Sequence, residues 1–529
     1  MRSAAVAGVM MALSLSGATS GAPFSTEVRI DSGALEGAVQ DGVLSFKGIP
    51  FAAPPVGDLR WRPPQPAPAW TGVRSATSYG HDCMQEPFPS DAAPLGTAPD
   101  EDCLVLNVWR PEAQTSSRLP VMVWIYGGGF VNGGSSPAVY DGSQFAKQGV
   151  VLVSFNYRVG RFGFFAHPAL RKEDPKGLLG NYAYMDQIAA LKWVKRNIAA
   201  FGGDAGNVTV FGESAGGISV HMLLTSPEAK GLFHKAIIES GGGRSGILPM
   251  RHISDDAGGQ KSAESIGLAF AKSAGIEGED RAALVALRKL PAAKLVNGLN
   301  MATMQAQGAT YAGGPMIDGR LVVEQLDQSY RASRFMKVPL IVGANSADIG
   351  FSSAKTMDEV FAPFGPDKDK ARAAYDADDT NDVRAVGTKV AMDRMMSEPA
   401  RYTARTLAAA GAPAYVFRFS YVAESMRAQW NGAPHATEIP YVFDTVAAKY
   451  GKDLTPKDAA TAHAMNTYWV NFARTGNPNS KGAVTWPAIG ARTDAIMDFT
   501  NDGPRAGADP WKTRLDVMEA AVSRAGSQP

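Results

Sequence analysis

Residues 210–219, VFGESAGGIS, combine a serine with small neighbours in a pattern that suits nucleophilic catalysis. Ser214 has glycines two positions before and after it, follows the apolar run 208–211 and precedes a stretch with helical character. This is the G-x-S-x-G pattern of a nucleophile on a sharp strand–turn–helix bend, where bulky neighbours would clash. The free N–H groups and the dipole of the following helix would favour negative charge beside the hydroxyl. Alone, the pattern is weak in a chain with 56 glycines.

A serine that attacks a carbonyl carbon needs hydrogen-bond donors for the oxyanion that forms. Three glycines, in YGGGFVNGG, follow the apolar run 121–126 and would let a carbonyl oxygen approach backbone N–H groups closely. We expect the N–H groups of Gly128, Gly129 and Ala215 to converge on one oxygen. The alternative is a glycine-rich turn without chemistry.

The serine also needs a base, and the base needs a carboxylate that orients it. Seven histidines compete: His81, His167, His221, His234, His252, His435 and His463. His221 comes two helical turns after Ser214 and is expected to point away from the hydroxyl. We expect His435 to be the base, because it lies in the small-residue loop NGAPHATEIPYVF after the apolar run 415–419.

The expected acid is Asp348, in VPLIVGANSADIGF, just past a predicted strand. The resulting order along the chain, serine then aspartate then histidine, is one of the known orders of such a triad. Asp318, in GPMIDGR, is the alternative acid, and a structural turn carboxylate is the more ordinary interpretation of it.

The elements that must position these residues are short apolar runs separated by longer helical stretches. Continuous apolar runs are typical of strands buried on both faces of a parallel sheet, and their alternation with helices predicts a doubly wound α/β fold. Residues 186–201 have helical spacing and end at two glycines, and 250–335 and 355–410 are expected to be inserted helices. We find no linker, so 23–529 is predicted to be one domain. The predicted strands are 121–126, 150–155, 208–211, 235–239, 338–342 and 415–419.

The first residues have the layout of a secretory signal peptide, with Arg2, an apolar run over 4–15 and small residues after it. We expect residues 1–22 to be removed, with the cut between 18 and 22, and the protein to be exported to the periplasm or beyond. The apolar run is short for a membrane span, so the mature protein is expected to have none. Net charge is +1, from 52 basic and 51 acidic residues, which gives no sign of a nucleic-acid partner.

Cys83 and Cys103 are the two cysteines of the chain. They could be unrelated buried thiols, or they could form one disulfide, which an oxidising compartment allows. A loop of about 20 residues closed in this way would stabilise the fold by roughly 3 kcal/mol.

Beyond these residues, the chain resembles the type-B carboxylesterases, the α/β-hydrolase family that also contains the cholinesterases. The resemblance covers nearly the whole mature chain and follows the family order in FKGIPFAAPPVGDLRWRPPQP, EDCLVLNVW, WIYGGGF, FNYRVGRFGFF, FGGDAGNVTVFGESAGG and GLFHKAIIESGG. It implies an α/β-hydrolase fold with a mostly parallel central sheet, flanking helices and inserted helices around a gorge. It also implies a Cys83–Cys103 disulfide.

The resemblance carries the catalytic roles to Ser214, His435 and Asp348 and the oxyanion donors to Gly128, Gly129 and Ala215. It places Ser240 and Glu438 in a hydrogen-bonded support beside the histidine, while Glu213 is expected to be buried and structural. The chain departs from the family where Asp348 replaces glutamate, and where Ile349 and Ala436 replace glycines. The shorter acid requires its loop to lie about 1 Å nearer His435, by one methylene.

The implied function is that of a serine carboxylic-ester hydrolase working through an acyl-enzyme, with no metal or organic cofactor. Small to medium esters with apolar or aryl groups are expected, since aromatic residues flank the motifs and no tryptophan lies between the two cysteines to stack on a choline group. Arg244 could meet an anionic acyl group, although a solvated loop arginine is the plainer interpretation. The alternatives are a lipase, a detoxifying esterase for a bulky ester, or a non-catalytic adhesion protein. The aromatic residues are Phe88, Phe130, Phe162, Phe164 and Phe165.

Overall fold

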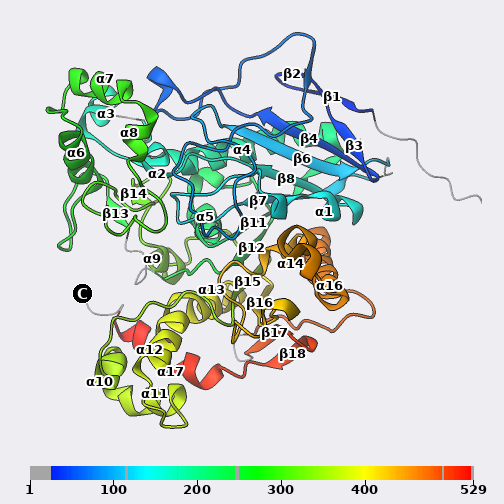
Figure 1. The fold of residues 1–529 in the computed structure, drawn as a ribbon, viewed down its shortest axis with the longest axis vertical. Helices are drawn as coiled ribbons and strands as arrows, with labels where there is room; N and C mark the ends of the chain where they lie inside the picture. Colours follow the sequence, from blue (N-terminus) through cyan, green and yellow to red (C-terminus); the bar gives the residue numbers. More distant parts are fainter. Residues whose placement is uncertain (1–24, 114–116, 175–176, 245–249, 491–493, 526–529) are drawn as a thin grey trace, which may run out of the picture.

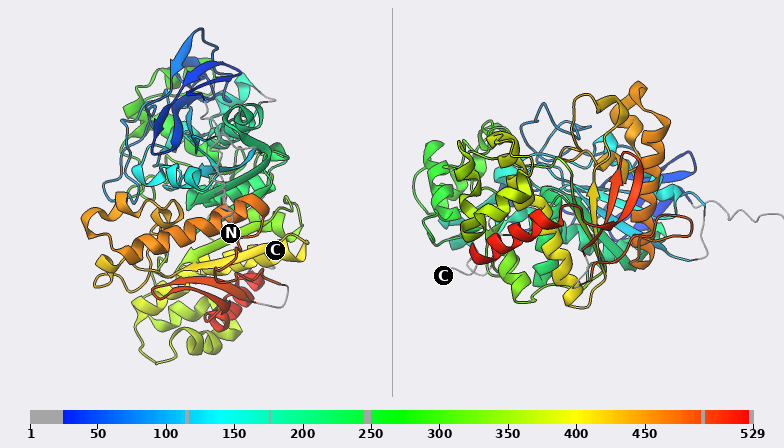
Figure 2. Two further views of the ribbon diagram at one scale, coloured as in Figure 1. Left: turned by 90° about the vertical axis from the view of Figure 1, so that its right-hand side faces the viewer. Right: turned by 90° about the horizontal axis from the view of Figure 1, so that it is seen from below.

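The computed structural model of the protein describes residues 25–113, 117–174, 177–244, 250–490 and 494–525. Its centre is an 11-stranded sheet in the order β18-β17-β16-β15-β12-β11-β7-β8-β6-β4-β3 (Figures 1 and 2). The strands from β17 to β8 pair in parallel, and those at the two edges pair antiparallel. The predicted signal peptide and its cleavage site lie outside the described residues.

The six predicted strands are all present in the parallel part of this sheet. Nearly all of their residues are buried, which is why these segments are continuous apolar runs rather than alternating ones. In chain order the sheet consists of β3 (Ala38–Gln40), β4 (Val43–Pro50), β6 (Val105–Pro111), β7 (Leu119–Ile125), β8 (Val151–Phe155), β11 (Gly203–Glu213), β12 (Lys235–Glu239), β15 (Leu340–Asn345), β16 (Ala414–Phe419), β17 (Ala495–Thr500) and β18 (Gly503–Ala508). A second small sheet contains β1 (Glu27–Ile30), β2 (Gly33–Glu36) and β5 (Val73–Ser75).

Long helices connect and cover the strands, as a doubly wound sheet requires. The predicted helix over 186–201 is α4 (Tyr182–Asn197) followed by one 3₁₀ turn (Ile198–Phe201), and it ends at Gly202 with φ 78°. The helix after the candidate nucleophile is α5 (Ala215–Thr225), and α16 (Pro456–Thr475) begins with a capping box between Thr455 and Asp458. Shorter helices are α1 (Ser143–Lys147), α2 (Gly160–Gly163), α3 (Pro168–Glu173), α14 (Ile439–Val442) and α15 (Val446–Tyr450).

The segment 250–335 is helical only in part. It contains α6 (Ala263–Ser273), α7 (Arg281–Lys289), α8 (Ala292–Val296) and α9 (Leu326–Arg331). The strands β13 (Arg251–His252) and β14 (Met316–Ile317) pair in parallel across it, and β9 (Phe164–Phe165) pairs with β10 (Gly180–Asn181) nearby. Two-residue strands are too short to leave a recognisable period in the sequence.

The segment 355–410 is helical as predicted and forms the lower end of the molecule in Figure 1. It contains α10 (Met357–Phe361), α11 (Lys368–Tyr375), α12 (Val383–Met392) and α13 (Glu398–Ala409), and α17 (Lys512–Ala525) joins it from the far end of the chain. α10, α11, α12 and α17 enclose a small apolar core of their own, separate from that of the sheet.

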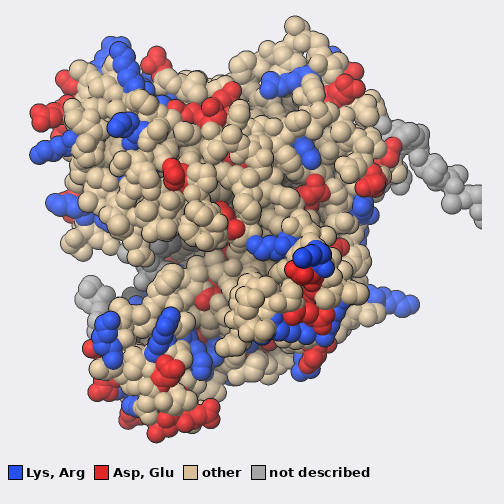
Figure 3. All heavy atoms as spheres, viewed as in Figure 1, with Lys and Arg blue, Asp and Glu red and all other residues tan. Residues whose placement is uncertain are grey.

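The two cysteines form the predicted disulfide, Cys83–Cys103, so the alternative of two free thiols was wrong. Within the described residues, no helix is long and apolar enough to cross a membrane. On the face seen in Figure 3, basic and acidic side chains are interspersed over the elements rather than gathered into a patch of one sign.

Candidate active site

Ser214 occupies a sharp bend between the end of β11 and the start of α5. Its backbone has φ 54° and ψ −122°, a strained conformation that costs about 1–3 kcal/mol for a residue other than glycine. A β-carbon on Gly212 would lie 2.6 Å from the backbone of Gly216, and one on Gly216 would lie 1.9 Å from the carbonyl oxygen of Ile125. The bend therefore has room for no side chain at either glycine, which is the physical basis of the G-x-S-x-G pattern.

The glycine turn after β7 lies directly against this bend. A β-carbon on Gly127 would lie 3.0 Å from Cβ of Ser214, and Gly128 and Gly129 have φ angles of 99° and 62°. Gly129 and Ala215 border the same cavity as Ser214. The backbone of this turn and the first N–H groups of α5 are thus close to the serine hydroxyl.

Asp348 and His435 come from loops at the ends of two neighbouring strands, β15 and β16. The two loops are joined by a bridge between Ala347 and Pro434, and the N–H of Ala347 donates to the carbonyl of Ala433 at 2.9 Å. His435 Nδ1 lies 2.6 Å from Asp348 Oδ1. An aspartate is therefore long enough to reach the imidazole here.

Three hydrogen-bond donors besides His435 surround the Asp348 carboxylate. Ser240 Oγ donates to Oδ2 at 2.7 Å, the backbone N–H of Asn345 donates to the same oxygen at 3.0 Å, and that of Ile349 donates to Oδ1 at 2.7 Å. Burial by itself raises the pKa of Asp348, but His435 and these hydrogen bonds hold the pKa below its ordinary value. The carboxyl is therefore charged at neutral pH although it is buried.

The other imidazole nitrogen faces a second carboxyl group. His435 Nε2 lies 3.1 Å from Oε1 of Glu213, the residue before Ser214, and within the described chain no hydrogen bond joins this nitrogen to Ser214 Oγ. Burial by itself lowers the pKa of His435, but the charges of Glu213 and Asp348 raise it to about 10. Burial also raises the pKa of Glu213 well above its ordinary range. When Glu213 is protonated it carries no charge, and it then no longer raises the pKa of His435.

Glu438 contacts Asn345, at the end of β15, and no hydrogen bond between Glu438 and Ser240 is found among the described residues. Asn345 Nδ2 donates to Glu438 Oε2 and also, at 2.7 Å, to the carbonyl of Pro434, the residue before His435. Burial raises the pKa of Glu438 to about 7. Ser240 instead donates to Asp348, so the two predicted supporting residues act on different partners. Asn345, which the sequence indicated only as part of the acid motif, connects them.

Ala436, at the position where the resemblance implies glycine, has φ 65°. A left-handed conformation is unfavourable for alanine, because its Cβ crowds the following carbonyl. The loop that carries His435 is therefore strained at the residue directly after the histidine.

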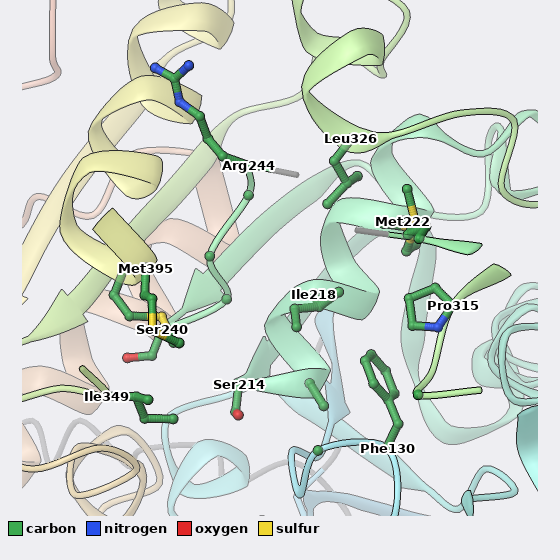
Figure 4. A pocket seen from close by; sticks show the side chains of 18 of the residues that line it. Phe130, Ser214, Ile218, Met222, Ser240, Arg244, Pro315, Leu326, Ile349 and Met395 are labelled. Carbon is green, nitrogen blue, oxygen red and sulfur yellow. The ribbon is translucent and has the colours of Figure 1, made fainter. Parts of the chain in front are cut away.

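A cavity of about 260 Å³ opens above Ser214, and Figure 3 shows the surface hollowed between the α6–α8 region and the lower helices. Its walls are mostly apolar, with Ile218 and Met222 on α5, Pro315 and Leu326 from the first insertion, and Met395 from the second (Figure 4). Five methionines contribute, which makes the walls adaptable. They are Met222, Met250, Met304, Met395 and Met396.

Arg244 borders this cavity but directs its side chain away from Ser214 (Figure 4). It is buried, its Nη2 lies 2.5 Å from Glu398 Oε1, and its guanidinium is 3.6 Å from the ring centre of Tyr402. The expectation of a solvated loop arginine was therefore wrong, because a buried carboxylate 154 positions later neutralises it. No other charged residue borders the cavity among those described.

The remaining candidate residues lie elsewhere. Of the five aromatic residues expected near the site, only Phe130 borders the cavity, while Phe162, Phe164 and Phe165 are part of the core. Asp318 accepts hydrogen bonds from Asn181 and from the backbone of its own turn. His221 lies 2.6 Å from the Tyr330 hydroxyl and does not face Ser214.

The chain is similar to known esterases over most of its length. A model of the carboxylesterase family matches residues 25–375 and 367–517. The chain is 37% identical over 504 residues to fumonisin B1 esterase of Sphingopyxis macrogoltabida, covering 91% of this chain and 88% of that one. It is 35% identical over 502 residues to para-nitrobenzyl esterase of Bacillus subtilis (strain 168), covering 89% and 95%.

The fold is also that of a known esterase. A solved structure of PNB esterase matches with a TM-score of 0.78 at 32% identity, over 93% of this chain and 99% of that one. The large, mostly parallel sheet is thus that of an α/β-hydrolase, and the chain belongs to the carboxylesterase family of carboxylic ester hydrolases.

Proposed function

We propose that this esterase uses Ser214 as nucleophile, His435 as general base and Asp348 as the carboxylate that orients the base. The main support is the geometry at the ends of β11, β15 and β16. There the strained serine, the histidine and a buried, charged aspartate follow three strands of the same sheet. The 2.6 Å contact between His435 Nδ1 and Asp348 Oδ1 fixes the tautomer in which Nε2 is free to accept a proton.

In the proposed reaction, Ser214 Oγ attacks the ester carbonyl carbon while His435 Nε2 takes its proton. The tetrahedral oxyanion accepts hydrogen bonds from the N–H groups of Gly128, Gly129 and Ala215, and the N-terminal end of α5 adds favourable potential. His435 then donates the proton to the leaving alcohol, which departs. Water cleaves the acyl-enzyme by the same proton path in reverse and releases the acid.

His435 must turn from Glu213 toward Ser214 for this reaction. Hydrogen bonds of catalytic groups are often long or misaligned before substrate binds, and Glu213 Oε1 and the nucleophile belong to adjacent residues. The proposed reaction therefore includes a rotation of the imidazole about its contact with Asp348 that brings Nε2 to the hydroxyl.

We propose that the substrates are small to medium esters with apolar or aryl groups. The cavity supports this, since its walls are mostly apolar and Arg244, the one charged residue among the described residues that border it, pairs with Glu398 and is directed away. Nothing described in the cavity would compensate the buried charge of an anionic acyl group, which is costly without a partner.

A longer or bulkier ester is the second candidate. A groove of about 550 Å³ adjoins the cavity and shares Gln305, Phe351 and Met395 with it. Phe351 is 74% exposed at this junction. An ester with an extended apolar group could occupy both spaces.

We also propose that residues 23–529 act as one exported unit after removal of the signal peptide. The Cys83–Cys103 disulfide supports an oxidising compartment, because cytosolic proteins seldom keep such bonds.

Replacing Ser214 with alanine tests the mechanism. We expect loss of p-nitrophenyl butyrate hydrolysis, of its acyl-enzyme burst and of labelling by a fluorophosphonate, while the fold is unchanged. The exposed Ser480 provides a matched control, and Ser480→Ala should keep all three. Undiminished turnover or labelling in Ser214→Ala would refute the assignment of the nucleophile.

A further inference from the structure

The glycine turn that faces Ser214 is held from outside by one buried side chain, that of Gln85. Its amide makes two hydrogen bonds to a single residue of the turn: Nε2 donates to the carbonyl of Gly133 at 2.7 Å, and the N–H of Gly133 donates to Oε1 at 2.8 Å. The side chain thereby imitates the backbone of a neighbouring strand. Gln85 is 6% exposed, so water does not compete for these bonds.

The next contacts lead from Gln85 to the turn residues beside the serine. Asn132 Nδ2 donates to Gln85 Oε1 at 3.2 Å and to the carbonyl of Glu86 at 2.6 Å. The backbone N–H of Asn132 donates to the carbonyl of Gly128 at 2.9 Å. Asn132 is thus held by the Gln85 segment on one side and holds Gly128 on the other.

Holding the Gly128 carbonyl also holds the N–H of Gly129. The two groups belong to one peptide unit, which is planar and trans, so they point in opposite directions along one plane. When the carbonyl is directed toward Asn132, the N–H must be directed away from it. Glycine places no steric limit of its own on this plane, so the contacts around it must set its orientation.

The other end of the support is anchored by the disulfide. Gln85 Nε2 also donates to the carbonyl of Cys83 at 2.9 Å, and Cys83 is bonded to Cys103. Asn132 Oδ1 accepts from the N–H of Met301 at 2.9 Å, on the segment that carries the cavity residue Met304. Gln85 therefore connects a covalently fixed loop to the turn and, through Asn132, to the cavity wall.

We propose that Gln85 is a positioning residue for the oxyanion hole: it orients the Gly128–Gly129 peptide without contacting the substrate. This inference rests on the proposed function, since it assigns a role only if the Gly129 N–H stabilises an oxyanion. Losing one oxyanion donor costs about 10²–10³-fold in kcat, and a displacement of about 1 Å costs about 10²-fold.

Gln85→Met keeps the length of the side chain and removes every hydrogen bond. We expect kcat for p-nitrophenyl butyrate to fall about 10–100-fold with KM changed less than about threefold. A trifluoromethyl ketone, whose adduct with the serine carries an oxyanion, should bind weaker by a similar factor. Binding of 1-butanol, which has an alkyl chain but neither a carbonyl group nor an oxyanion, should be unchanged, because it depends on the cavity walls.

Gln65→Met is the matched control, since Gln65 is exposed and its side chain bonds only to the carbonyl of Pro63 among the described contacts. Should Gln85→Met fail to fold, Gln85→Glu serves instead. It keeps the acceptor for Gly133 and Asn132 but directs an oxygen at the Gly133 and Cys83 carbonyls. We expect a kcat loss of the same direction.

The outcomes separate this inference from the proposed function. A wild-type protein that neither turns over esters nor reacts with a fluorophosphonate would contradict the proposed function. An active wild-type protein with an unimpaired Gln85→Met variant would contradict the positioning role alone. Equal weakening of the ketone and of 1-butanol would also overturn it, because that pattern indicates general damage to the cavity.

Discussion

Three buried carboxyl groups lie near His435, and their hydrogen bonds give them different charge states. Asp348 receives donors from a hydroxyl and two backbone N–H groups, so its charge is stabilised despite burial. Oε1 of Glu213 makes no hydrogen bond in the described structure and faces His435 Nε2 at 3.1 Å, and burial favours the neutral form of Glu213. Because the pKa values of these neighbouring acids differ, Asp348 can remain an anion while the charge of Glu213 changes with the protonation of His435.

This difference predicts the pH dependence of catalysis. As the proposed base, His435 must be neutral, and the charges of Glu213 and Asp348 raise its pKa from 6.5 to about 10. kcat/KM should therefore rise with pH along an acid limb whose midpoint lies above 6.5. Glu213→Gln removes one negative charge that stabilises the imidazolium, so the pKa of His435 should fall and the acid limb should move to lower pH. The measurement is kcat/KM for a neutral ester between about pH 5 and about pH 10.

Glu277→Gln is the control for this experiment, because Glu277 is exposed and has no described contact with the site. Its profile should coincide with that of the wild type. A Glu213→Gln limb that moved upward would contradict the proposed electrostatic coupling, as would a wild-type midpoint at or below 6.5.

At the scale of elements, the loops after β15 and β16 determine where Asp348 and His435 meet. The sequence predicted both loops, because each follows a continuous apolar run of the kind that is typical of a buried strand. It could not predict that Asn345 joins the loops through Glu438 and Pro434. The two partners are about 90 positions away, and an amide side chain leaves no periodic signal. The contact between Gln85 and Gly133 was equally unpredictable from the sequence, since the two residues are 48 positions apart.

The strain at Ala436 gives a prediction about the loop after β16. At φ 65° an alanine costs about 1–2 kcal/mol, whereas glycine costs about 0.4–1 kcal/mol through the entropy of the unfolded chain. Ala436→Gly should therefore stabilise the protein by about 0.5–1 kcal/mol. The denaturant midpoint measures this change.

Ala483 offers a control of opposite sign, since it is exposed in a loop and is not among the residues with positive φ. Ala483→Gly should lower the midpoint, because only the entropic term applies. If Ala436→Gly also lowered it, the loop would not be strained in the way that its backbone angles indicate.

At the scale of the whole molecule, the sheet was predictable and the cavity was not. The motifs place Ser214, Asp348 and His435 at the ends of predicted strands, so their proximity follows from the topology of a parallel sheet. The cavity walls come from the two insertions, whose packing depends on contacts between distant segments. Arg244 shows the consequence. From the sequence it was expected to contact either water or an anionic acyl group, because nothing in the sequence indicates that Glu398, 154 positions later, is its partner.

The position of the cavity between the two insertions predicts where a long alcohol group would go. In the proposed mechanism His435 protonates the leaving alcohol, and Ile349 and Phe351, which border the cavity, come one and three residues after the aspartate that contacts it. We therefore expect the alcohol side to face the groove, which Phe351 also borders, rather than α5. Ala391 on α12 borders that groove, and Ala391→Trp would fill it. Each methylene group kept from burial costs about 0.8 kcal/mol, so two of them lower kcat/KM about tenfold.

We therefore expect Ala391→Trp to lower kcat/KM for decyl butyrate at least about tenfold and for ethyl butyrate less than about twofold, measured by titration of released acid. Ala385→Trp is the control, because Ala385 is exposed on the same helix and does not border the groove. Its kinetics should match those of the wild type with both esters. An equal loss for both esters in Ala391→Trp would mean that the alcohol chain does not enter the groove, and that long esters extend along α5 past Met222 instead.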